Sequence, residues 1–269
     1  MKGLAVSNIA WTPEEDEAMA AMLRDEGVTA IELAPTAWRS EPYDASHADV
    51  LALRDTWKNR GLSVVSLQSL LFGRPDLQLF GDDSVRRALA EYMRRAMDFA
   101  RTLGARTLVF GSPKNRRRGD LPLANALEIA ADFFRDLGPY AANADVTICI
   151  EANPADYGGD FILTTDEAVE LARSVDHPNI RVNGDLGGMM LAGDDIARTI
   201  ASSAPWLAHF HASEPALAEL SNAATHELAG TALEQAGYTG WVSIEMRRAA
   251  SGSNVDAVRR AIRVASRSY

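Results

Sequence analysis

The sequence predicts an α/β fold, a single (β/α)8 TIM barrel, and three observations support this fold class. Short apolar runs alternate with longer helical patterns from one end of the chain to the other. Eight such units in 269 residues have the size and number expected of this barrel. The glycine-rich phosphate loop typical of a doubly wound sheet does not follow the first apolar run. We therefore expect one domain over residues 1–269.

The expected strands are eight apolar runs, in chain order Gly3–Ser7, Ala30–Leu33, Ser63–Leu67, Thr107–Phe110, Val146–Glu151, Ile180–Asp185, Leu207–His211 and Val242–Glu245. Because helices separate them, the strands should pair in parallel through right-handed crossovers. Polar and apolar side chains alternate in the last three strands, with the polar set pointing into the barrel. Branched aliphatic side chains dominate a purely structural barrel interior. A polar interior on one side therefore indicates a lined pocket.

The helical stretches carry apolar residues at three-to-four spacing and have recognisable ends. Thr12, Pro13 and the two acids after them predict a helix start, because proline fits a first turn and carboxylates favour its dipole. The segment 165–167 opens the helix that continues through residue 174 in the same way. The helix 85–103 should end at Gly104.

Composition narrows the class of protein. The net charge of −10 argues against a nucleic-acid-binding role, which usually needs a basic surface. We expect no membrane partner, because no run of 18 apolar residues occurs. The apolar run at the N-terminus is also too short for a signal peptide. A single cysteine, Cys149, excludes an intramolecular disulfide and favours a cytoplasmic protein. The sequence leaves open whether the chain forms a homo-oligomer.

Four successive strands near the C-terminus end in a potential metal ligand: Glu151, Asp185, His211 and Glu245. The ends of neighbouring parallel strands lie about 5 Å apart, so these side chains should converge. Like charges at that separation require a cation between them. The mixed ligand set suits Mn²⁺, Mg²⁺, Co²⁺ or Zn²⁺. A divalent metal site is therefore the main functional prediction, whereas His209, one layer deeper, is expected to be a hydrogen-bonded core residue.

Other candidates lie in loops at the same face of the barrel. Lys114 opens the basic run 114–118 and is a candidate to bind an anionic group of the substrate, whereas we expect the arginines of the run to be solvated. Trp11 and Trp38 could stack on a sugar, although ordinary packing would explain them equally well.

Five segments are distinctive as a set: Ile150-Glu151-Ala152-Asn153-Pro154, Gly158-Gly159-Asp160-Phe161, Thr164-Thr165-Asp166-Glu167-Ala168, His209-Phe210-His211-Ala212-Ser213-Glu214 and Gly237-Tyr238-Thr239-Gly240-Trp241-Val242-Ser243-Ile244-Glu245-Met246. Through these segments the chain resembles the sugar phosphate isomerase/epimerase group of xylose isomerase-like TIM barrels, which also includes ketose 3-epimerases, inosose dehydratases and endonuclease IV. Glu214, within the fourth of these segments, is a further candidate to bind substrate.

The resemblance implies that Glu151, Asp185, His211 and Glu245 hold the cation, and that Glu151 and Glu245 act as the catalytic acid/base pair. One position departs from the pattern, because Gly188 stands where these enzymes usually carry a histidine that orients the substrate. That departure puts a standard ketose epimerisation in doubt and makes a different substrate or a lyase reaction more credible.

We expect a metal-dependent isomerase or epimerase that abstracts a proton next to the carbonyl of a sugar or polyol, through a metal-stabilised enediolate. A dehydratase acting on an inosose-like substrate is the main alternative. An endonuclease IV-like phosphodiesterase is disfavoured, because that chemistry uses several histidines from early strands, where Gln68 and Ser112 stand here. A homologue that binds metal but has lost catalysis is the remaining alternative.

Overall fold

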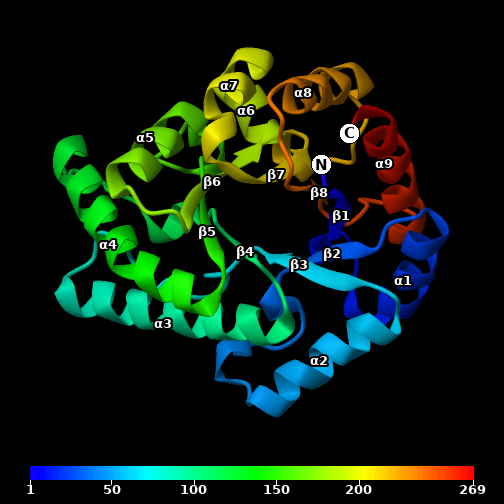
Figure 1. Cartoon of the computed structure of the whole chain (residues 1–269), viewed down its shortest axis with the longest axis horizontal. Helices are drawn as coiled ribbons and strands as arrows, with labels where there is room; N and C mark the ends of the chain where they lie inside the picture. Colours follow the sequence, from blue (N-terminus) through cyan, green and yellow to red (C-terminus); the bar gives the residue numbers. More distant parts are fainter.

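The computed structural model describes all 269 residues and contains a closed barrel of eight parallel strands. The strands pair in chain order, and β8 closes the barrel by pairing with β1. The helices surround the barrel on its outside (Figure 1). The strands are β1 Gly3–Ser7, β2 Ala30–Leu33, β3 Ser63–Leu67, β4 Thr107–Phe110, β5 Thr147–Glu151, β6 Ile180–Asp185, β7 Leu207–Ser213 and β8 Trp241–Glu245. The predicted (β/α)8 fold is confirmed.

Strand β7 differs most from the sequence-based expectation, since it continues past His211 to Ser213. The extension has a consequence for the centre of the barrel, because it pairs Ser213 with Glu245 of β8. Two residues earlier in the register, His211 pairs with Ser243. Side chains two residues apart on a strand point to the same face. His211 and Ser213 therefore both point toward the barrel interior, at successive levels.

Nine α-helices connect the strands: α1 Asp16–Asp25, α2 His47–Asn59, α3 Asp83–Leu103, α4 Leu123–Ala144, α5 Thr165–Val175, α6 Leu186–Ala192, α7 Ile196–Ser203, α8 Ala223–Gln235 and α9 Asn254–Ser268. The connection from β6 to β7 contains two short helices, α6 and α7. The helix start expected at Pro13 is a separate 3-10 turn, Pro13–Glu15, which precedes α1. Helix α3 ends at Gly104, whose φ of 94° is a left-handed conformation that glycine adopts without strain.

The apolar faces of the helices pack against the outward-facing side chains of the strands. Buried apolar residues form one cluster of 71, which extends from Val6 on β1 to Ala265 on α9. This layer fixes the positions of the strand ends, which carry most of the polar residues described below. None of the helices is both long enough and apolar enough to cross a membrane.

Candidate metal centre and active site

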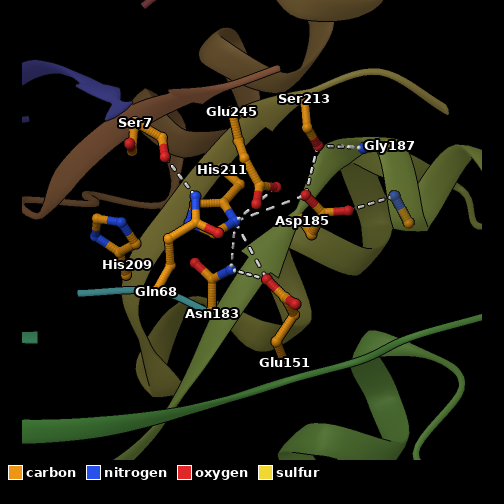
Figure 2. A network of polar contacts seen from close by, with 12 residues as sticks. Ser7, Gln68, Glu151, Asn183, Asp185, Gly187, His209, His211, Ser213 and Glu245 are labelled. Atoms are coloured by element: carbon orange, nitrogen blue, oxygen red, sulfur yellow. Dashed lines mark hydrogen bonds and ion pairs between the residues drawn. The ribbon is translucent and has the colours of Figure 1, made fainter. Parts of the chain in front are cut away.

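Four side chains from consecutive strands meet at one end of the barrel (Figure 2). The Nδ1 atom of His211 lies 3.2 Å from Glu151 Oε1, 3.2 Å from Glu245 Oε2 and 3.9 Å from Asp185 Oδ2. The potential ligand atoms of Glu151, Asp185 and His211 lie within 4.8 Å of one another. The structure thus brings together all four residues proposed from the sequence as ligands. We call Glu151, Asp185, His211 and Glu245 the ligand cluster.

Strand register explains why these side chains converge. Asp185 of β6 pairs directly with His211 of β7, so their side chains leave the barrel wall at the same level. Glu151 of β5 pairs with Asn183, one inward-facing position below Asp185. Glu245 of β8 lies one such position above the residue paired with His211. From β5 to β8 the four side chains therefore lie at successively higher levels of the barrel wall, with Asp185 and His211 at the same level, and they point toward a common region.

The donor set fits a divalent cation. Three carboxylates and one imidazole nitrogen are a mixed oxygen and nitrogen set of the kind that Mn²⁺, Co²⁺ or Zn²⁺ accepts. Burial, together with the charges of Glu151 and Glu245, raises the pKa of Asp185 to about 7. Burial also raises the pKa of Glu245. Crowded carboxylates of this kind are relieved when a cation lies between them.

Glu32 of β2 is a buried acid that the sequence analysis did not select. One of its oxygens, Oε2, lies 3.0 Å from His211 Nε2, and the other, Oε1, lies 3.0 Å from His209 Nε2. Ser243 donates a further hydrogen bond to Oε2, also at 3.0 Å. His209 is fully buried in this cluster and is the hydrogen-bonded core residue that we expected. Glu32 therefore lies on the side of the His211 ring that faces away from the ligand cluster.

This arrangement decides which nitrogen of His211 is free for a metal. A carboxylate beside one ring nitrogen keeps the proton there, so that the other nitrogen presents its lone pair. Burial strongly opposes ionisation of Glu32, but the neighbouring His211 and His209 outweigh it and hold the pKa of Glu32 well below its ordinary value. Glu32 is therefore an anion whose charge, 3.0 Å from Nε2 of His211, favours the proton on that nitrogen. Nδ1 faces the four-residue cluster, where Asn183 Nδ2 also contacts it at 3.1 Å.

Asp185 is held by the start of helix α6 and by β7. Its Oδ1 accepts the Gly188 backbone N–H at 2.6 Å, and its Oδ2 accepts the Ser213 hydroxyl. Ser213 in turn accepts the Gly187 N–H at 2.9 Å. A Cβ atom at position 188 would lie 2.9 Å from Asp185 Oδ1 and 3.6 Å from Pro154. Any side chain at this position would therefore press on the aspartate.

Glu151 is held from two sides. Asn183 Nδ2 donates to its Oε1 at 2.7 Å, and Asn153 Nδ2 donates to its Oε2 at 3.2 Å. Arg116 donates to the Glu151 backbone carbonyl and, at 2.7 Å, to Asn153 Oδ1. The expectation that the arginines of the run 114–118 are solvated is wrong for Arg116, which is 2% exposed. Its neighbour Arg117 is exposed, as expected.

A cavity of about 490 Å³ opens beside the ligand cluster, on the side of the loops that follow β3 and β4. Glu151, His211 and Glu245 form its floor, and most of its remaining lining is polar or glycine. Lys114 is exposed and contributes to the wall of this cavity, as its assignment as a substrate-binding candidate requires. The cavity is large enough for a monosaccharide, and its wall combines hydrogen-bonding groups with apolar side chains such as Leu71 and Phe72.

The other substrate-binding candidates lie elsewhere. Trp11 is 1% exposed, donates its indole N–H to Asp16 and lines a separate small cavity together with Trp38. Glu214 is buried, and its Oε1 accepts the backbone N–H groups of Ser221 and Asn222. These contacts give the two tryptophans a packing role and Glu214 a role in fixing the loop before α8. The structure therefore brings only Lys114 of this group to the large cavity.

Backbone strain is concentrated in the loops at this end of the barrel. Ser69, Ile162, Ala216 and Leu217 all have φ between 53° and 59°, a left-handed conformation that is costly for residues with a side chain. Ser69 lines the large cavity. Strain of this kind persists where the surrounding contacts fix a loop, and it is frequent at functional sites.

Comparisons with known proteins agree with the fold. The family model for xylose isomerase-like TIM barrels matches residues 20–267, and the chain belongs to that family. No curated protein sequence matches the chain significantly.

Similar solved structures share the fold at low sequence identity. D-psicose 3-epimerase from Clostridium cellulolyticum H10, solved with D-tagatose, is 18% identical with a TM-score of 0.79 over 100% of this chain and 96% of that one. The 3-keto-D-glucoside 4-epimerase from E. coli is 18% identical with a TM-score of 0.77 over 97% and 98%. The IOLI protein with a bound zinc atom is 14% identical with a TM-score of 0.73 over 100% and 99%.

Proposed function

We propose that this protein is a divalent-metal-dependent isomerase or epimerase that acts on a sugar or polyol-like carbonyl compound. The observation that carries the proposal is the position of the ligand cluster, whose Glu151, His211 and Glu245 line the cavity of about 490 Å³. Membership of the xylose isomerase-like family and the fold shared with sugar epimerases support the same reaction class.

Glu151, Asp185, His211 and Glu245 would hold the ion. When bound, the ion would polarise the substrate carbonyl and stabilise negative charge that develops on it. His211 would offer Nδ1, because Glu32 fixes the proton on Nε2. Asp185 is anchored by Gly188 N–H and the Ser213 hydroxyl and is therefore assigned to ion binding alone.

Glu151 and Glu245 have the geometry of an acid/base pair. They come from β5 and β8, with two strands between them, and approach His211 Nδ1 at the same distance of 3.2 Å. Both also line the cavity. A carbon atom placed between them would meet one carboxylate on each side. One carboxylate then removes the proton beside the carbonyl, and the other delivers a proton to the opposite side of the same carbon or to the former carbonyl carbon. In the second case the hydroxyl proton also moves from the neighbouring oxygen to the former carbonyl oxygen. The first outcome is epimerisation and the second is aldose–ketose isomerisation.

A dehydratase is the second candidate, and Gly188 is the observation that favours it. No side chain reaches toward the substrate from the start of helix α6, where the epimerase pattern has a histidine. The same proton abstraction, followed by loss of a hydroxyl group from the next carbon, would give an unsaturated product. This reaction needs the acid/base pair but a different orientation of the substrate.

Product analysis separates these reactions. We would incubate the Mn²⁺-loaded protein with ketohexoses, ketopentoses, inososes and their phosphates, and separate the products by chromatography and mass spectrometry. A product of unchanged mass supports isomerase or epimerase activity, and a loss of water supports the dehydratase. Absence of any product from all of these compounds, on protein shown to hold one equivalent of metal, would contradict both.

A further inference from the structure

Arg116 is a buried cation without an acidic partner. It is 2% exposed and forms no salt bridge, although the charge of the nearby Glu151 partly offsets the effect of burial, which lowers the pKa of Arg116. Its hydrogen bonds go to neutral oxygens, namely the backbone carbonyls of Phe110 and Glu151 and the side chain of Asn153. Its Nε has no partner. Burying a charge that is not paired is costly, so this position calls for an explanation beyond packing.

Two of the three hydrogen bonds of Arg116 lead to Glu151. One guanidinium nitrogen, Nη2, bonds both the Glu151 carbonyl and Asn153 Oδ1. Asn153 uses its other amide atom, Nδ2, to donate to Glu151 Oε2 at 3.2 Å. Arg116 thus fixes the main chain of Glu151 directly and its carboxylate through Asn153. Because the Asn153 oxygen is occupied by Arg116, the amide can present only its N–H₂ group to the carboxylate.

The loop that carries Arg116 is itself rigidly placed. The preceding residue, Asn115, donates to the carbonyl oxygens of Arg74 and Leu77, at 2.7 and 2.6 Å. The Asn115 carbonyl accepts the Leu79 N–H at 2.8 Å. These bonds tie the loop after β4 to the loop after β3, which forms the other wall of the large cavity. The hydrogen bonds of Asn115 therefore hold in place the loop from which the Arg116 guanidinium contacts Glu151.

We propose that Arg116 is a positioning residue that sets the Glu151 carboxylate for ion binding and proton transfer, with Asn153 as the link between them. This inference rests on the proposed function, because it assigns Arg116 to the same centre. The planar guanidinium can bond the carbonyl and the amide oxygen together, whereas a lysine ammonium has neither the shape nor the reach to replace it in the same place.

The test compares Arg116→Lys, Asn153→Ala and the double variant with the wild type. Arg117→Lys is the matched control, since Arg117 is the exposed neighbour in the same basic run. Co²⁺ is the probe, because its visible absorption reports how its ligands are arranged and a titration gives its Kd. Thermal melting of each metal-free variant checks that the barrel is folded.

We expect Arg116→Lys and Asn153→Ala each to weaken Co²⁺ binding by about 10-fold to 100-fold and to change the absorption spectrum, as loss of a group that orients a metal ligand does. The double variant should be little worse than either single variant, because both substitutions break one chain of contacts. Arg117→Lys should match the wild type. Where a substrate is turned over, kcat should fall more than KM rises.

Three results would overturn the inference. The first is an Arg116→Lys variant that matches Arg117→Lys in Kd and spectrum. The second is a double variant whose loss equals the product of the single losses. The third applies if Arg116→Lys does not fold: an Asn153→Ala variant with an unchanged Co²⁺ spectrum then overturns the inference. If any of these results is obtained while the wild type binds Co²⁺, only the role of Arg116 is refuted and the proposed function is unaffected. If the wild type binds no Co²⁺, the proposed function itself is contradicted.

Discussion

Glu32 on β2 and His211 on β7 meet inside the barrel, with Oε2 of the glutamate 3.0 Å from Nε2 of the histidine. Both side chains are almost completely buried, at 0% and 1% exposure. The contact joins the two halves of the barrel, because these strands are not neighbours in the sheet. It also orients the imidazole, since Nδ1 is left facing Glu151 and Glu245. The geometry of the proposed metal site therefore depends on a residue outside the proposed ligand set.

Substitution of Glu32 by glutamine should weaken metal binding without removing a ligand. The neutral amide no longer favours the proton on Nε2, so His211 loses its fixed orientation and part of its basicity. Loss of such a partner typically costs about 10-fold to 100-fold in metal affinity. Isothermal titration with Mn²⁺ measures the change. An unchanged Mn²⁺ affinity in a folded Glu32→Gln variant would refute this role for Glu32.

Substitution of either proposed acid/base residue should remove turnover. Glu151→Gln and Glu245→Gln keep the size of the side chain but cannot take up a proton, and each should lower kcat by at least about 100-fold. Steady-state rates on the substrate found in the product screen provide the measurement. The metal content of each variant must be determined in parallel, because both residues are also proposed ligands. Near-normal rates in both variants would contradict the mechanism.

Metal affinity should fall as the pH falls below about 7. Burial and the neighbouring carboxylates raise the pKa of Asp185 to about 7, so Asp185 is protonated below that pH in the metal-free protein. Burial opposes protonation of His211, but Glu32 and Glu245 outweigh it and raise the pKa of His211 well above its ordinary value. Both groups must lose protons to bind a cation, and each such proton costs about tenfold in affinity per pH unit below its pKa. Mn²⁺ titrations at pH 6 and pH 8 should show this trend, and equal affinities at the two pH values would count against it.

Gly111 should be essential for the placement of Glu151. A Cβ atom at this position would collide with the Glu151 carboxylate, since it would lie 2.9 Å from Glu151 Cδ and still closer to Oε2. The carboxylate is the mobile end of a side chain, so Gly111→Ala should displace it and leave the barrel intact. We expect a change in the Co²⁺ absorption spectrum and a loss of activity of at least about tenfold, in the range seen when a catalytic group is displaced by about 1 Å. A variant with the wild-type spectrum and rate would show that Glu151 tolerates the added methyl group.

The fold and the convergence of four side chains were predictable from the sequence for a simple physical reason. In a parallel barrel every strand ends at the same face, so an ionisable residue at the end of each of four successive apolar runs must reach a common region. The alternation of polar and apolar residues in β6, β7 and β8 gives the side of the strand on which each residue lies. Neither argument needs a distance in three dimensions.

Glu32 and Arg116 could not be assigned in this way. Glu32 lies in the four-residue strand β2, between Ile31 and Leu33, and its only signal is a charge at an inward position of a buried strand. Its partners come from β7 and β8, more than 170 residues later in the chain. Arg116 is one of several basic residues in a loop, and only burial in the folded protein distinguishes it from Arg117.

Deuterium uptake from D₂O tests the central claim most directly, because it detects proton abstraction even when no net conversion occurs. NMR spectra of a candidate ketose or inosose would be compared with protein that is loaded with Mn²⁺ and with protein that has been stripped by chelation. We predict that deuterium enters at a carbon beside the carbonyl only with the loaded protein, and that Glu151→Gln and Glu245→Gln abolish the uptake. Loaded wild-type protein that exchanges no proton in any of these compounds would contradict the proposed metal-dependent proton transfer.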